Sequence, residues 1–254
     1  MKITILGSGS AYGVPMIFNQ WRNANPENPK NIRTRACVLI EENDKSVLID
    51  AGPDLRQQIN SFNIKDVDAL LLTHGHYDHI GGVPELPRAS TLLGHGIDVW
   101  ASEETMSELK ISYGYLFRGE EPEGVGIHWK TLPDLGKFEC CGLNFETYRV
   151  PHHHLHSSAF RLGDFAYMTD WEDISEDGIN VLRGVKCLLV ECNNGLYYEK
   201  NGHSNLDKVK EIAVKIGDPR IVLTHLSARV DYDELAKFVP EHWLPAYDGM
   251  VLDM

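Results

Sequence analysis

Short apolar runs alternate along the chain with longer segments of mixed polarity. The runs are rich in aliphatic and β-branched residues and end at polar residues, which is the pattern of buried strands. They cover residues 2–6, 36–41, 46–50, 69–73, 165–169, 187–191 and 220–224. Apolar residues at helical spacing predict helices over 55–62, 103–113, 206–216 and 232–238. Asn205 and Asp231 are suited to cap the last two of these helices.

The order of these elements predicts an α/β protein with two similar layers. Each half of the chain runs through strands, then a strand that ends in a polar turn, then helices, so we expect two sheets packed face to face. Side chains of residues 143–150 alternate weakly between two faces, which fits a strand of a mixed sheet. Residues 17–35 are polar and rich in Asn and Pro, which predicts a long surface loop. No linker divides the chain, so residues 1–254 are predicted to form one domain.

Composition narrows the function classes. The 24 Lys and Arg stand against 37 Asp and Glu, a formal charge of -13, which argues against a broad footprint on nucleic acid. No apolar run approaches the roughly 20 residues that span a bilayer, so no membrane partner is expected. The 5 cysteines are scattered and form no CxxC pair, as in reduced cytosolic proteins. The sequence therefore predicts a soluble cytoplasmic protein.

The 12 histidines are crowded into a few short stretches, and the densest stretch follows the strand at 69–73. There His74, His76, Asp78 and His79 form an HxHxDH cluster. Residues two apart in an extended segment point to one side, so His74 and His76 can hold one metal ion. A turn beginning near Asp78 would direct Asp78 and His79 toward a second ion. Such a dense cluster is not explained by ordinary buried histidines.

Three further strand ends offer the remaining ligands. Residues 152, 153, 154 and 156 are all histidine, and one of them is expected to bind metal while the others line the pocket or face solvent. Asp170 follows an apolar strand and could bridge two cations, although an isolated Asp at this place more often caps a helix. His225 follows the strand at 220–224 and repeats the Leu-Thr-His ending of the first cluster.

Together these features resemble the metallo-β-lactamase superfamily of binuclear hydrolases. The opening LGSGSAYGVP at 6–15, the LIDAGPD turn at 48–54 and the YDGM ending at 247–250 are similar to one branch, the phosphoribosyl cyclic phosphodiesterases of phosphonate breakdown. The resemblance implies a four-layer αββα sandwich of two mixed sheets flanked by helices.

The resemblance also implies a ligand set. His74, His76 and a mid-chain histidine would hold the first metal. The distance in sequence from residues 159–161 favours His152 as this histidine, and His153 is the alternative. The second metal would be held by Asp78, His79 and His225, with Asp170 bridging the two ions. Thiol-free sites of His and Asp accept zinc, manganese or iron, so the sequence does not choose the metal.

Members of this branch often carry a structural zinc held by cysteines of the long N-terminal loop and by a histidine three residues after the late Thr-His. In this chain residues 16–35 contain no Cys, and Ala228 stands at the histidine position. We therefore expect no additional zinc in this loop. Trp21 and hydrogen bonds of the Asn side chains are expected to hold it instead.

The resemblance predicts phosphodiester hydrolysis through a hydroxide that bridges two cations. Asp78 is expected both to bind metal and to take part in catalysis. His203 would protonate the leaving group. An exposed histidine in a turn is the alternative interpretation of His203 and explains it nearly as well. Asp50 and Asp248 are expected to orient metal-bound imidazoles.

The expected substrate is a small, anionic phosphodiester, either cyclic or open, and a homodimer is left open. The alternatives are a ribonuclease Z-like tRNA 3′ processing enzyme, a hydrolase of carbon esters, thioesters or lactones, and a non-catalytic metal-binding protein. The acidic charge and the absence of an evident basic arm count against the tRNA enzyme.

Overall fold

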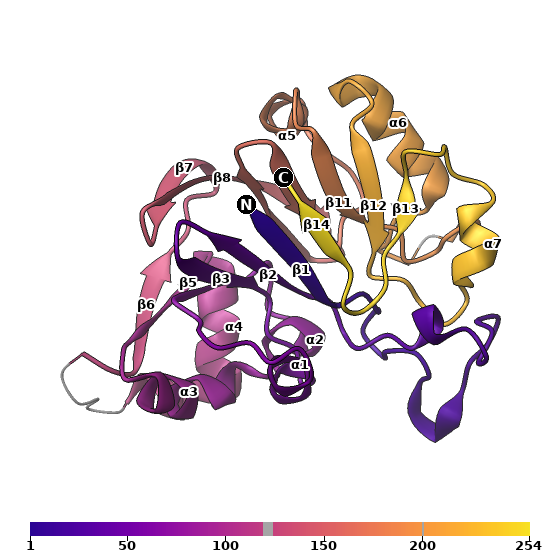
Figure 1. The fold of residues 1–254 in the computed structure, drawn as a ribbon. Helices are drawn as coiled ribbons and strands as arrows, with labels where there is room; N and C mark the ends of the chain where they lie inside the picture. Colours follow the sequence, from indigo (N-terminus) through magenta and orange to yellow (C-terminus); the bar gives the residue numbers. More distant parts are fainter. Residues whose placement is uncertain (119–123, 200) are drawn as a thin grey trace.

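Two mixed sheets form the centre of the computed structural model, which describes residues 1–118, 124–199 and 201–254 (Figure 1). The first sheet has the order β14-β1-β2-β3-β4-β5-β6 and the second β13-β12-β11-β10-β9-β8-β7. The first sheet comprises β1 (Lys2–Gly7), β2 (Cys37–Glu42), β3 (Lys45–Ile49), β4 (Ala69–Leu71), β5 (Ile97–Ala101), β6 (Ile127–Thr131) and β14 (Val251–Asp253). The second comprises β7 (Leu135–Cys140), β8 (Leu143–His152), β9 (Leu155–Leu162), β10 (Phe165–Met168), β11 (Cys187–Glu191), β12 (Arg220–Thr224) and β13 (Leu244–Pro245).

Each sheet has a parallel half and an antiparallel half. Strands β3 to β6 pair in parallel, and so do β10 to β13, whereas β14, β1, β2 and β3 are antiparallel neighbours, as are β7 to β10. The first and last strands of the chain, β1 and β14, lie side by side (Figure 1).

The central strands of each sheet are apolar on both faces because both faces are covered. Along β2, Val38 and Ile40 point into the core between the sheets, while Cys37 and Leu39 point to the helices outside the first sheet. This period of two is repeated in the second sheet, where alternate residues of β11 and β12 face the inter-sheet core and the outer helices. The predicted αββα sandwich is therefore confirmed.

Helices pack on the outer face of each sheet. Residues of α1, α3 and α4 join the core outside the first sheet, and residues of α5 and α6 join the core outside the second. The helices are α1 (Leu55–Ser61), α2 (Tyr77–Ile80), α3 (Leu86–Leu93), α4 (Glu103–Tyr113), α5 (Glu176–Leu182), α6 (Leu206–Ile216) and α7 (Tyr232–Ala236), with 3₁₀ turns at Ile17–Asn19, Pro29–Asn31, Val83–Glu85 and Gly114–Phe117. Within the described part of the chain, none is long and apolar enough to cross a membrane.

The predicted elements are found with small changes at their ends. Asn205 and Asp231 cap α6 and α7, accepting bonds from the amides of Lys208 and Glu234. Strand β4 ends at Leu71, two residues early, because the Thr73 amide turns to the Asp50 carboxylate. The sequence analysis did not predict strands within 97–140, where β7 is largely exposed and carries no continuous apolar run.

The N-terminal loop is held by its Asn side chains, as expected, but it is not wholly on the surface. The Asn31 amide group donates to Asp231 Oδ2 at 2.7 Å, and its oxygen accepts from the Arg33 guanidinium at 2.7 Å and from the Tyr232 amide at 2.9 Å. Both Asn31 and Arg33 are buried, and burial lowers the pKa of Arg33 to about 10. Trp21 packs beside Ala228.

Replacing Asn31 by Ala should lower the free energy of unfolding by about 2–4 kcal/mol, because it leaves a buried guanidinium and a buried amide without their acceptor. Urea unfolding measures this loss. Asn23→Ala, an exposed change in the same loop, serves as the control and should stay within about 0.5 kcal/mol of the parent. Equal stability of both variants would show that the Asn31 network does not hold the loop.

Candidate metal centre

The polar residues identified in the sequence meet where the strands of both sheets end. Asp50 follows β3 and His74 lies three residues beyond β4 in the first sheet, and β8, β10, β11 and β12 of the second sheet lead to His152, Asp170, Glu191 and His225. The carboxyl ends of neighbouring parallel strands lie at one edge of a sheet, which is where such folds place their ligands. The two edges face each other across this group of side chains.

Three of the turns at these strand ends are left-handed. Asp50, Asp170 and His225 have φ values of 64°, 52° and 54°. A non-glycine residue in this conformation is uncommon, and such strain is concentrated at functional sites. After these turns the Asp170 and His225 side chains lie beside His79 and Asp78 of the first half of the chain. The Asp50 carboxylate contacts Thr73 and His79.

The HxHxDH segment passes from extended chain into a short helix. His76 is the N-cap of α2, and the buried Asp78 and His79 lie within the helix. A β-carbon at Gly82 would lie 2.3 Å from the carbonyl oxygen of Gly52, so glycine is needed for α2 to approach the turn after β3. The turn predicted near Asp78 is therefore this helix.

His74, His76 and His152 form the first group of ligand atoms, which all lie within 4.8 Å of one another. His74 Nε2 and His76 Nδ1 are only 2.9 Å apart. His152 is buried, whereas His153 is exposed and has a φ of 52°. The structure thus brings His152, and not His153, to His74 and His76.

Asp78, His79 and His225 form the second group, again within 4.8 Å. His79 Nδ1 bonds the Asp50 carboxylate at 2.7 Å, which leaves Nε2 as the nitrogen with a free lone pair. This buried Nε2 has no hydrogen-bond partner among the described residues, although Asp78 Oδ2 lies only 3.0 Å away. A buried lone pair beside two carboxylates fits a cation, and the donor set of this group therefore suits a metal ion.

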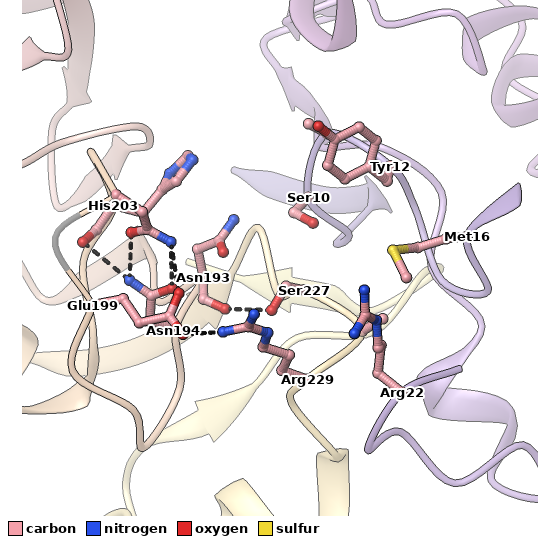
Figure 2. A pocket seen from close by; sticks show the side chains of 13 residues that line it. Ser10, Tyr12, Met16, Arg22, Asn193, Asn194, Glu199, His203, Ser227 and Arg229 are labelled. Carbon is pink, nitrogen blue, oxygen red and sulfur yellow. Dashed lines mark hydrogen bonds and ion pairs between the residues drawn. The ribbon is translucent and has the colours of Figure 1, made fainter. Parts of the chain in front are cut away.

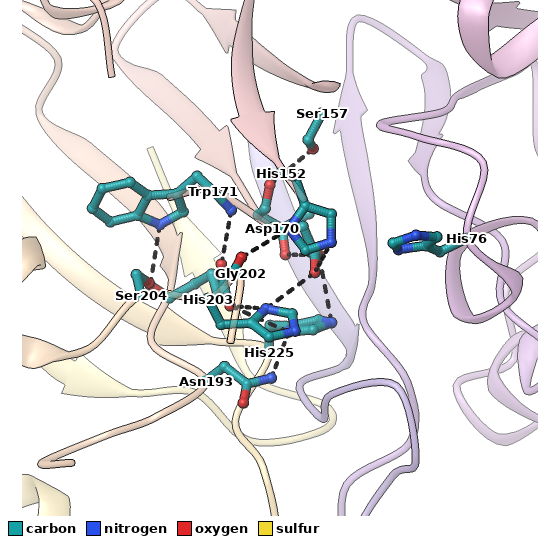
Figure 3. A network of polar contacts seen from close by, with 12 residues as sticks. His76, His152, Ser157, Asp170, Trp171, Asn193, Gly202, His203, Ser204 and His225 are labelled. Atoms are coloured by element: carbon teal, nitrogen blue, oxygen red, sulfur yellow. Dashed lines mark hydrogen bonds and ion pairs between the residues drawn. The ribbon is translucent and has the colours of Figure 1, made fainter. Parts of the chain in front are cut away.

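Asp170 lies between the two groups (Figure 3). Its Oδ1 is 3.6 Å from His152 Nε2, and its Oδ2 is 3.2 Å from His79 Nε2 and 3.5 Å from His225 Nε2. Each carboxylate oxygen therefore faces a different group, which is the arrangement a bridging ligand needs. Figure 3 also shows His76, from the N-terminal half of the chain, facing this cluster.

A second contact fixes the orientation of most of these imidazoles. His74 Nδ1 contacts Thr73 Oγ1 at 3.0 Å, His152 Nδ1 donates to the Gly202 carbonyl at 2.9 Å, and His225 Nδ1 lies 3.3 Å from Asn193 Nδ2. In each ring the other nitrogen is turned to the cluster. Such contacts set ring orientation and tautomer in metal sites.

The electrostatics of His74 and Asp170 favour the protonation states that metal ligands require. Burial holds the pKa of His74 well below its ordinary value, so its imidazole is neutral. Burial opposes ionisation of Asp170, but the neighbouring His225 and His79 outweigh it and hold the pKa of this carboxyl well below its ordinary value. Neutral imidazoles and ionised carboxylates are the forms that bind metal ions.

His79 differs from His74 in its electrostatics. Burial lowers the pKa of His79, but the carboxylates of Asp78, Asp50 and Asp170 outweigh it and raise the pKa well above its ordinary value. Metal binding at His79 would therefore displace a proton.

Glu191 is the functional residue that sequence reasoning missed. It is fully buried, its Oε1 accepts from His203 Nδ1 at 2.6 Å, and its Oε2 accepts from the Trp171 amide at 3.0 Å. Burial lowers the pKa of His203, but the carboxylates of Glu191 and Asp170 outweigh it and raise the pKa to about 9. The signal was a strand that ends in a carboxylate, as the strand before Asp170 does.

His203 is not an exposed turn residue. Asp248 does not orient a metal-bound imidazole, which was its expected role. The His203 side chain is 18% exposed and its Nδ1 lies 3.4 Å from Asp170 Oδ1. Asp50 contacts His79 as expected, but Asp248 contacts no imidazole of the described residues. Its carboxylate accepts from the amides and hydroxyls of Ser8 and Thr34, so it joins β1 to the N-terminal loop instead.

Two cavities meet at His203. One of about 310 Å³ lies toward the N-terminal loop and is lined by residues such as Tyr12, Arg22 and Asn193 (Figure 2). The other, of about 660 Å³, is lined by residues such as His153 and Glu172. A bound molecule can therefore extend on both sides of His203.

The model of the family described as "Beta-lactamase superfamily domain" matches residues 45–226, most of this chain. The chain therefore belongs to the β-lactamase superfamily, and it has the fold of that superfamily's metal-dependent hydrolases. Its His and Asp clusters are suited to divalent metal ions.

Within the superfamily the chain is similar to a solved member of the PhnP family. The crystal structure of a new diphosphatase from the PhnP family superposes with a TM-score of 0.90 at 29% identity, covering 100% of this chain and 97% of that one. Exodeoxyribonuclease WalJ of Streptococcus pneumoniae is 26% identical over 226 residues, 78% of this chain and 79% of that protein.

A third relative is longer than this chain. An octanoyltransferase of Porphyromonas gingivalis is 32% identical over 257 residues, which cover 98% of this chain but 51% of that protein. The chain thus spans about half the length of this relative.

Replacing Asp170 by Ala should remove more bound metal than replacing any single ligand histidine, because its two carboxylate oxygens face different groups. Metal per chain is measured by inductively coupled plasma mass spectrometry on protein purified without added metal. Asp177→Ala, which removes an exposed carboxylate from α5, should keep the full metal content. Full occupancy in Asp170→Ala would contradict a bridging position.

Proposed function

We propose that the protein is a binuclear metal-dependent phosphodiesterase that acts on small, anionic phosphodiesters. One ion is held by the first group and the other by the second, with Asp170 between them. The proposed ligands are His74, His76 and His152 for the first ion and Asp78, His79 and His225 for the second. Two divalent ions, when bound, lower the pKa of water toward about 7 and neutralise the charge of an anionic substrate. Zinc, manganese and iron all suit this donor set.

The observation that carries the proposal is the position of His203 between two cavities and beside Asp170. A phosphodiester has two organic substituents on one phosphorus atom. One cavity can accommodate each substituent while the phosphoryl group lies at the ligand cluster. His203 would then be next to the ester oxygen that leaves.

His203 supplies the proton that the leaving oxygen needs. Glu191 accepts the Nδ1 proton, so the proton available for transfer is the one on Nε2. The carboxylate also stabilises the imidazolium, because it lies 2.6 Å from the ring nitrogen and is itself fully buried. An alkoxide is a poor leaving group, and protonation during bond cleavage speeds its departure.

Phosphate chemistry is further supported by the relatives. The diphosphatase of the PhnP family and the exodeoxyribonuclease WalJ are both named for cleavage of phosphate bonds. The formal charge of -13 favours a small substrate over a long nucleic acid, whose phosphates would be repelled. Carbon esters and pre-tRNA are therefore controls in the test and not the proposed substrates.

An activity panel tests the reaction class. Metal-loaded protein should hydrolyse bis-p-nitrophenyl phosphate and nucleoside 2′,3′-cyclic phosphates faster than a nucleoside diphosphate, a thioester or pre-tRNA. Chelation should abolish the activity and readdition of metal should restore it. A preference for the thioester, or for pre-tRNA, would replace the proposed function by that reaction.

Replacing His203 by Ala should lower kcat by roughly 10²–10⁴-fold on diesters with alkoxide leaving groups, with a similar KM and an unchanged metal content. The loss should be much smaller on p-nitrophenyl esters, because p-nitrophenolate needs little protonation to leave. His156→Ala, an exposed change in the same histidine-rich tract, should leave both rates unchanged. Equal losses on both substrate types would show that His203 contacts phosphate and is no general acid.

A further inference from the structure

Two histidines outside the proposed ligand set lie together beside the metal centre. One nitrogen from each of His152, His153 and His203 lies within 4.8 Å of the other two, although only His152 belongs to the proposed ligands. The ring centroids of His153 and His203 are 5.9 Å apart, and the two rings are nearly perpendicular at 87°. These two imidazoles are therefore close enough to bind one ion between them.

Backbone and packing contacts hold His153 in this position. Its amide donates to Glu172 Oε1 at 2.5 Å, and its φ of 52° is a left-handed conformation. The ring packs against Gly202, where a β-carbon would lie 2.1 Å from His153 Cε1, so a larger residue would displace the ring. The carbonyl of the same Gly202 accepts from His152 Nδ1 (Figure 3). The His153 ring thus has a defined place, although the residue is exposed.

The two rings have nitrogens to offer to an ion. Glu191 accepts the Nδ1 proton of His203, which leaves Nε2 for another partner. Within residues 1–118, 124–199 and 201–254 the ring of His153 forms no hydrogen bond or ion pair, and only its backbone amide is bonded. Both nitrogens of His152, in contrast, already face other partners. An additional ion would therefore take one ligand from His153 and one from His203.

The surrounding cavity favours a cation. His153 and His203 line the cavity of about 660 Å³. Among the described residues that line it, the charged ones other than histidine are Glu172, Asp173, Glu199 and Lys208. Glu199 is paired with Arg229, which leaves two carboxylates against one ammonium group. An excess of carboxylates raises the local concentration of cations, and a cavity of this size has room for an ion with its water ligands.

We propose that His153 and His203 form a site for a further, inhibitory divalent ion, which zinc fills when it is in excess. The inference rests on the proposed function, because it concerns the proton that His203 gives to the leaving group. An ion that binds His203 Nε2 takes the lone pair of this nitrogen, and the proton passes to solvent. His203 then has no proton to donate.

The donor set gives this site two properties. With only two protein ligands it binds zinc more weakly than the proposed centre, so it fills only after that centre is loaded. Imidazole ligands favour zinc over manganese, so manganese should fill the site poorly.

Zinc binding tests the site without catalysis. Wild type, His153→Ala and His154→Ala are dialysed against rising zinc concentrations, and metal per chain is measured by inductively coupled plasma mass spectrometry. The wild type should bind one ion more than His153→Ala over at least about a 10-fold range of free zinc, because loss of a ligand costs at least as much affinity as loss of a contact to a ligand. His154→Ala is the matched control, since it removes the neighbouring exposed histidine and should bind as the wild type does.

Zinc inhibition tests the consequence of filling the site. Saturating zinc should lower wild-type kcat/KM for nucleoside 2′,3′-cyclic phosphates by roughly 10²–10⁴-fold, the loss expected without a general acid, and should lower it much less for bis-p-nitrophenyl phosphate. His153→Ala should need at least about 10-fold more zinc for the same fractional loss, measured against its own maximal rate. Excess manganese should not inhibit.

The inference is overturned if the wild type and His153→Ala bind equal amounts of zinc, or if His153→Ala is inhibited as easily as the wild type. Equal inhibition on both substrate types would also contradict it. An ion that is lost with His153, in a protein that hydrolyses no phosphodiester, would keep the site and reject the proposed function. Phosphodiester hydrolysis that excess zinc leaves unchanged would do the reverse.

Discussion

The structure depends on burying imidazoles and carboxylates together at one place, where the strand ends of the two sheets meet. We call this place the seam. His74, His79, Asp170 and His225 are each at most 1% exposed, and removing such groups from water costs several kcal/mol for each ion unless their charges are compensated. Contacts with Thr73, Asp50 and Asn193 occupy the Nδ1 side of the His74, His79 and His225 rings. The other side faces the carboxylates of Asp78 and Asp170, and divalent cations, when bound there, would supply the compensating positive charge.

This requirement explains the arrangement of the two sheets. Their carboxyl ends meet at the seam, and backbone bonds join them there: the Ser158 amide donates to the Thr73 carbonyl at 2.8 Å, and the Leu226 amide donates to the Ser8 carbonyl at 2.9 Å. A ligand on one sheet therefore cannot shift without moving its counterpart on the other. The N-terminal loop is bonded to the Ala228 carbonyl and lines the cavity that ends at His203.

Residues adjacent in sequence were predictable, and contacts between distant segments were not. The HxHxDH cluster and the strand before Asp170 have local patterns, so the sequence indicated both the ligands and the layers. Glu191 ended a predicted strand in the same way, yet only the fold shows that His203 lies against it. Asp248 was assigned wrongly because a carboxylate near a turn has no sequence signal for its partner, which is the N-terminal loop.

The central claim is that side chains from both sheets hold two ions with Asp170 between them. Anomalous diffraction at the absorption edge of the bound metal tests it most directly. The account predicts two peaks, one bounded by His74, His76 and His152 and one by Asp78, His79 and His225. A single peak, or peaks whose nearest side chains exclude Asp170, would contradict it.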